Sequence, residues 1–143
     1  METVYFANEH VTIYYDAATR TGRGVWVGFL SNEDLREPVR QGLKLIAEEK
    51  PVKWLADNRK LKAIRQQDQE WLQENMMPAL AVSSLRKMAS LITEDIFGQM
   101  AIDSLYSKAT HLINFDHHYF TSEAEAYQWL EEDITENNFQ LRN

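Results

Sequence analysis

Four basic side chains lie close together in the middle of the chain, after a short apolar stretch. They are Arg59, Lys60, Lys62 and Arg65, and Asp57 and Asn58 come directly before them. A helix is predicted to begin at Gln66, and the free N–H groups and dipole of a helix N-terminus favour anions. Open α/β sheets also bind ligands beyond the carboxyl ends of their strands. The segment Asp57–Asp68 therefore predicts a surface for an anionic ligand or an acidic partner protein, with a solvated loop as the alternative.

Asp68 shares one face of this predicted helix with Trp71. A carboxylate beside apolar side chains needs ionic or hydrogen-bonding partners, because burying it alone is costly. Asp68 could contact a ligand or transfer a proton, or it could accept backbone N–H groups at the start of its own helix. An enzyme that uses Asp57, Asp68 or the pair His117 and His118 is the most distant functional hypothesis.

The tryptophans could line a pocket for a small ligand. They are Trp26, Trp54, Trp71 and Trp129. Ligand pockets are mostly apolar with a few polar groups, and tryptophan suits that composition. Each tryptophan also stands at a position compatible with the core, so core packing is the alternative. A domain that binds a small apolar or anionic ligand is the second functional hypothesis.

The histidines near the C-terminus do not predict a metal site. Successive residues of a strand point to opposite faces, so His117 and His118 cannot easily bind one ion. His111 would lie about 20 Å from His117 in an extended strand. Asp116 and His118 would supply only two ligands. We expect no metal and no other cofactor.

The composition excludes several kinds of chemistry. The chain of 143 residues contains no cysteine, which excludes thiol catalysis and cysteine-ligated metals. It also lacks a Gly-x-Ser-x-Gly motif and a glycine-rich phosphate loop. The net charge of −7 disfavours binding to nucleic acid and to anionic membranes. These features predict a protein that is not an enzyme and that binds neither nucleic acid nor membrane.

Neither a leader nor a membrane-spanning segment is visible in the sequence. Residues Met1–Val4 carry no basic group, and the longest apolar run is Val25–Leu30. A membrane span needs about 20 apolar residues. Together with the lack of cysteine, this predicts a cytoplasmic protein. The length is typical of one domain, so residues 1–143 are expected to form a single domain.

Hydrophobic periodicity predicts strands and helices that alternate along the chain. The predicted strands are Val4–Ala7, His10–Asp16, Gly24–Leu30, Val52–Ala56, Arg86–Thr93 and His111–Phe120. The predicted helices are Ser31–Lys50, Gln66–Met77, Glu94–Ala109 and Ser122–Asp133. In the third helix, the side chains predicted to face the core are Ile96, Phe97, Met100 and Ala101. The residues from Asp57 to Ile64 are expected to form a connector.

The order of these elements predicts an α/β fold. The strands His10–Asp16 and Gly24–Leu30 are expected to form an N-terminal antiparallel hairpin. The helices and strands that follow alternate, which indicates βαβ crossovers and a parallel part of the sheet. The expected result is one mixed sheet with amphipathic helices packed against it.

Several stretches of the sequence resemble the small bacterial SpoIIAA-like proteins, which are relatives of STAS domains (sulfate transporter and anti-sigma-factor antagonist). The most specific stretch is KWLADNRKLKAIRQQDQEWL, residues 53–72. A Trp-x-Gly-Phe element begins at Trp26, and a Tyr-Phe-Thr-Ser step at residues 119–122 leads to Ala126 and the Trp129–Leu130 pair. The resemblance implies a mixed sheet of four or five strands with the helices packed largely on one face.

The resemblance also implies a function in bacterial signalling or regulation. In STAS antagonists, the loop and helix after a central strand bind a partner kinase, and phosphorylation of a serine there switches the binding. The matching segment Asp57–Asp68 contains no serine, threonine or tyrosine, so this switch is not expected. The leading hypothesis is a non-catalytic STAS-like interaction module that binds a protein partner.

A homodimer that pairs through an exposed edge strand is a further expectation. The ligand or partner surface is predicted to comprise Asp57, Asn58, Arg59, Lys60, Lys62, Arg65, Asp68 and Trp71.

Overall fold

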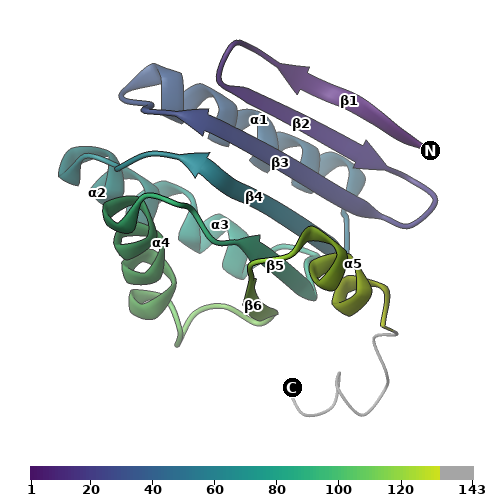
Figure 1. The fold of residues 1–143 in the computed structure, drawn as a ribbon. Coiled ribbons are helices and arrows are strands. Elements are labelled where there is room, and N and C mark those ends of the chain that lie inside the picture. Colours follow the sequence, from purple (N-terminus) through teal and green to yellow (C-terminus); the bar gives the residue numbers. More distant parts are fainter. Residues whose placement is uncertain (133–143) are drawn as a thin grey trace.

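The computed structural model describes residues 1–132, which contain a six-stranded sheet. The strands are β1 (Glu2–Ala7), β2 (Val11–Asp16), β3 (Thr21–Gly28), β4 (Lys53–Leu61), β5 (Lys87–Leu91) and β6 (Asp116–Phe120). They lie side by side in chain order (Figure 1). The expectation of four or five strands is wrong, because β1 and β6 both join the sheet as edge strands.

The sheet is mixed, as predicted. Strands β1, β2 and β3 pair antiparallel, which confirms the N-terminal hairpin. Strands β3, β4, β5 and β6 pair parallel. The three parallel connections each contain a helix, because a parallel pair needs a long crossover to return the chain to the same end of the sheet.

The helices cover both faces of the sheet, but unequally. They are α1 (Glu33–Glu49), α2 (Gln66–Asn75), α3 (Met77–Ala81), α4 (Ile96–Lys108) and α5 (Glu123–Glu131). Helices α1 to α4 share one large core with the sheet, and α5 packs on the other face in a smaller core around Leu55, Ala89 and Leu130 (Figure 1). None of the helices in residues 1–132 is long and apolar enough to cross a membrane.

Local signals fix where several helices begin and end. Helix α1 ends at Lys50, which takes the left-handed conformation directly before Pro51. Asp95 accepts two backbone N–H groups from the first turn of α4. Ser122 caps the last helix, since its Oγ accepts the Glu125 N–H at 3.3 Å. The predicted end of that helix, Asp133, lies outside the described residues.

The prediction of which face of α4 is buried is wrong. Ile96, Phe97 and Met100 are 69%, 67% and 60% exposed, and among the predicted residues Ala101 alone faces the core. The helix instead turns Gly98 towards the loop that follows β4. A Cβ at Gly98 would lie 2.8 Å from the carbonyl oxygen of Lys62, so only glycine allows this close approach.

The last predicted strand was too long. Residues 111–115 are not part of β6, which begins at Asp116. They carry the chain from the end of α4 to the sheet, and the Leu112 N–H donates to the carbonyl of Ala109 at 2.8 Å. Phe115 is buried in the core although it is not in a strand, which explains why its apolar character misled the prediction.

Candidate functional site

The predicted connector after β4 is in fact a continuation of that strand. β4 runs to Leu61, and it remains paired with β3 through a bulge opposite Val25–Val27. Aspartate and asparagine are depleted in strands, which is why the polar residues from Asp57 onwards resembled a loop. The prediction of a connector from Asp57 to Ile64 is therefore wrong, and the loop is limited to the four residues before α2.

The two faces of β4 have different surroundings. Trp54, Ala56 and Asn58 face the helices α1 to α4, whereas Leu55 belongs to the core beneath α5. Successive residues of β4 therefore lie on opposite sides of the sheet. This alternation separates Asn58 from Asp57 and Arg59, although the three residues are consecutive.

Asp57 and Arg59 form an ion pair on the side of α5. Arg59 donates to both oxygens of Asp57, at 2.9 and 2.7 Å, and to Glu123 of α5 at 3.3 Å. Burial raises the pKa of Asp57, but the hydrogen bonds from Arg59 outweigh this and keep the pKa below its ordinary value. Through its contact with Glu123, the ion pair links the start of α5 to β4 at the centre of the sheet.

Asp68 joins the beginnings of α1 and α2. Its carboxylate is fully buried and accepts the Arg65 Nε at 3.0 Å, the Arg36 Nη2 at 3.3 Å and the backbone N–H of Asn32 at 3.2 Å. Asn32 has a φ of 52°, which turns its N–H towards this carboxylate. Asp68 therefore has the partners that a buried carboxylate needs, and they come mainly from a different part of the chain.

Trp71 strengthens the same connection between α1 and α2. The guanidinium carbons of Arg36 and Arg40 each lie 5.4 Å from the centre of its ring, close enough for cation–π attraction. The neighbours of these residues in sequence, Leu35 and Leu72, turn towards the space between the helices and the sheet. Asp68 and Trp71 thus brace one edge of that space.

The eight residues of the predicted surface do not lie on one surface. Asp57, Asn58 and Asp68 are buried, and Arg59 and Arg65 are held in ion pairs. The side chains that remain well exposed are Lys60 and Lys62. A partner protein that binds these two lysines remains a prediction, on a smaller surface than expected.

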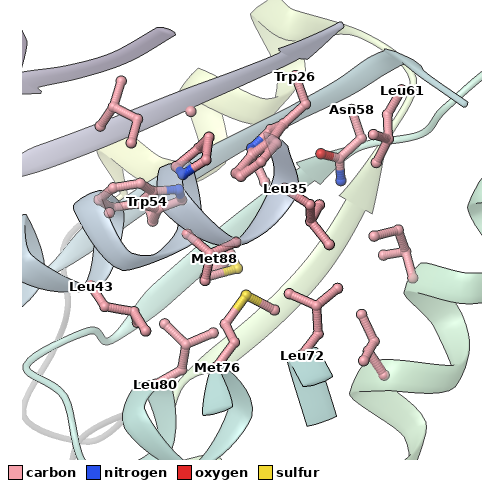
Figure 2. Close-up of a pocket in the computed structure, with 18 of the residues that line it drawn as sticks. Trp26, Leu35, Leu43, Trp54, Asn58, Leu61, Leu72, Met76, Leu80 and Met88 are labelled. Carbon is pink, nitrogen blue, oxygen red and sulfur yellow. The ribbon is translucent and has the colours of Figure 1, made fainter. Parts of the chain in front are cut away.

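A cavity of about 100 Å³ lies between the sheet and helices α1 to α4. Its walls are apolar side chains from both layers, and Figure 2 shows how they surround it. They include Leu35 and Leu43 of α1, Leu72 of α2, Leu80 of α3, and Met88 of β5. Within residues 1–132, none of the residues that line it carries a charged side chain.

The cavity exists because small residues stand where a sheet usually presents large ones. Gly24 faces it from β3, and the ring of Trp54 occupies the space above Gly22, where a Cβ would clash with that ring. Ala56 occupies the next inward position of the central strand. Although helices cover this face, Ala56 is not fully buried, which shows that a water-sized space lies against it.

Three polar side chains of the sheet face this space without a partner. Asn58 is only 6% exposed, yet in residues 1–132 its amide makes no hydrogen bond. The indole N–H groups of Trp26 and Trp54 also make no hydrogen bond within the described part of the chain. None of these three is among the fully buried polar atoms that lack a partner, so solvent or a ligand in the cavity can reach them.

Tyr106 completes the wall near β5, and His117 packs against Tyr106 without lining the cavity itself. The Tyr106 hydroxyl lies 2.8 Å from the Met88 sulfur, and its ring stacks on His117 with 3.8 Å between centres. The His117 Nε2 lies 2.7 Å from the Ser90 Oγ. Burial lowers the pKa of His117 to about 4, so this histidine is neutral at physiological pH.

His118 faces the opposite side of β6 from His117. It stacks on Trp129 of α5 with 4.4 Å between ring centres. The prediction that the two histidines point to opposite faces of the strand is therefore confirmed. Trp129 belongs to the smaller core, so Trp26 and Trp54 are the tryptophans that reach the cavity.

Sequence reasoning named Asn58, Trp26 and Trp54 but did not place them together. It missed Ala56 and Gly24, because their contribution is the absence of a side chain. The signal was present in the alternation of Gly22, Gly24 and Trp26, which puts two glycines and an indole on one face of a strand.

Comparisons with family models, with curated proteins and with solved structures found no match to this chain. The site is therefore interpreted from its own geometry.

Proposed function

We propose that this protein is a non-catalytic binding domain that holds a small apolar molecule in the cavity between its sheet and helices α1 to α4. The observation that carries the proposal is the open space above Ala56 at the centre of the sheet. A structural core is close-packed, and a space of this size is expensive to leave empty. A cavity that is apolar, partly open and furnished with a few polar groups is the usual form of a ligand site.

The size of the cavity limits the molecule that fits. An engineered cavity of about 150 Å³ in another protein binds benzene. The present cavity of about 100 Å³ is smaller. It suits a ligand of roughly six non-hydrogen atoms, or one end of a longer molecule. Met76 and Met88 in its wall are flexible enough to adapt to several shapes.

This proposal differs from the interaction module that the basic segment predicts. That module requires Asp57 to Asp68 to form an accessible surface, and most of these side chains are engaged in contacts within the protein. The cavity requires only residues that already face it. Kinship with SpoIIAA-like proteins and a cytoplasmic location are also proposals, which rest on residues 53–72 and on the composition.

The test is thermal unfolding of the protein with and without benzene. A ligand that binds only the folded state at ten times its Kd stabilises that state by about 1.4 kcal/mol. We expect benzene to raise the Tm of the wild-type protein and to leave the Tm of the Ala56→Leu variant unchanged, because leucine fills the site. An equal response of the two proteins to benzene would show that it does not bind in this cavity.

A further inference from the structure

The polar groups of the cavity gather at one place on the sheet. A Cβ built at Gly24 would lie 3.1 Å from the Nε1 of Trp26 and 3.7 Å from the Nε1 of Trp54. Both indole nitrogens therefore lie above the same glycine, which has no side chain to fill the space between them. Figure 2 shows Asn58 beside Trp26 on this side of the cavity.

The chemistry of these groups defines what they can bind. An indole N–H donates a hydrogen bond and cannot accept one, whereas an amide can do both. A molecule that faces Trp26 and Trp54 must therefore offer an acceptor. The folded protein supplies no acceptor to these donors, so an acceptor on the ligand would take the place of the water that can reach them.

The charge of the ligand follows from the lining of the cavity. A buried carboxylate needs a cation or several hydrogen bonds, and a buried ammonium group needs an anion. The residues that line the cavity include neither a cation nor an anion. Only uncharged ligands avoid this desolvation cost.

We propose that the cavity selects an uncharged apolar molecule with one hydrogen-bond acceptor, such as a carbonyl oxygen or a ring nitrogen, which binds between the indole N–H groups of Trp26 and Trp54. This inference rests on the proposed function, since it names the class of ligand for the same cavity. The apolar part of the ligand lies against Leu72, Met76 and Met88. Asn58 supplies a further hydrogen bond to the polar end.

The experiment compares three probes of six non-hydrogen atoms: pyridine, benzene and butyrate. Pyridine and benzene have nearly the same shape, but only pyridine has an acceptor, and it is uncharged at neutral pH. The readout is the ¹H–¹⁵N spectrum of the indole N–H groups, which gives one signal for each of the four tryptophans. The variants Trp26→Phe and Trp54→Phe assign two of these signals and each remove one donor.

We expect pyridine to bind at least as tightly as benzene and to move the Trp26 and Trp54 signals downfield relative to the benzene complex. Benzene serves as the control for the ring-current effect of an aromatic ligand. At least one of the two Trp→Phe variants should weaken pyridine binding roughly tenfold and benzene binding less than twofold, because the single lone pair of pyridine accepts a hydrogen bond from one indole and benzene accepts none. Butyrate should not bind.

Two failures are distinguishable. If neither benzene nor pyridine binds, the proposed function itself is wrong and the polar groups serve only ordered water. If benzene binds but pyridine binds tenfold more weakly and leaves the indole signals at their benzene positions, the cavity takes apolar molecules and the acceptor site is wrong. Binding of butyrate as tight as that of pyridine would overturn the requirement for an uncharged ligand.

Discussion

Replacing Ala56 by leucine fills the cavity from the centre of the sheet. Ala56 faces the space between β4 and the helices, and it retains some exposure although it lies on a central strand. The substitution adds three carbon atoms to a volume of about 100 Å³. The variant should therefore gain apolar contacts without displacing its neighbours.

The magnitude follows from the area that the new atoms bury. Each buried methylene group contributes about 0.8 kcal/mol, so three carbons contribute about 2 kcal/mol to the free energy of unfolding. Part of this gain is lost if leucine must leave its preferred rotamer, since such strain costs about 1 kcal/mol. The variant Ala56→Val adds two carbons, has high strand propensity and should gain about 1.5 kcal/mol.

The assay is urea denaturation with linear extrapolation of the free energy of unfolding. The matched control is Ala89→Leu, the same substitution on the neighbouring strand β5. Ala89 is fully buried beneath α5, outside the cavity, so leucine there overpacks the core and should destabilise the protein by about 1–3 kcal/mol. Equal destabilisation by the two substitutions would refute the reasoning, because it would show that the space above Ala56 is already filled.

Two further perturbations test the surroundings of the cavity. Asp68→Asn removes the negative charge that pairs with Arg36 and Arg65, and we expect it to lower the free energy of unfolding by about 3 kcal/mol. A loss below about 0.5 kcal/mol in the same urea assay would contradict the role of Asp68 in joining α1 to α2. His117 has a pKa of about 4 in the folded protein against 6.5 for the free side chain, so the unfolded chain takes up a proton first as the pH falls. Titration of His117 should therefore lower the free energy of unfolding of the wild-type protein by about 2 kcal/mol between pH 7 and pH 5. The His117→Gln variant should lack this contribution. Parallel pH profiles of the two proteins would count against a buried neutral His117.

The fold was largely predictable from the sequence, because its helices and strands carry clear periodicity. Periodicity predicted the helix Ser31–Lys50, and Leu35, Val39, Leu43 and Ile46 of α1 do face the core. The alternating residues of β2 and β3 predicted the hairpin. The prediction failed where a local preference competes with a long-range contact, as at Gly98, where close packing on Lys62 rotates α4 away from its most apolar face.

The candidate site was less predictable, for two physical reasons. Ion pairs such as Asp57–Arg59 and Asp68–Arg65 convert apparently solvated residues into internal connections, and sequence spacing does not reveal such partners. A cavity is also an absence of atoms, which becomes visible only when the opposing layers are placed together. Asn58 was named for its neighbours in the basic segment, whereas its side chain points to the opposite face of the strand from theirs.

The central claim is that the space above Ala56 admits a small apolar molecule. Diffraction from crystals under xenon pressure tests it most directly, because xenon binds apolar cavities and scatters strongly. The account predicts one strong xenon peak bordered by Ala56, Leu72 and Met88 in the wild-type protein and its loss in Ala56→Leu. Wild-type crystals with no xenon at this position, or with the same peak in the variant, would contradict it.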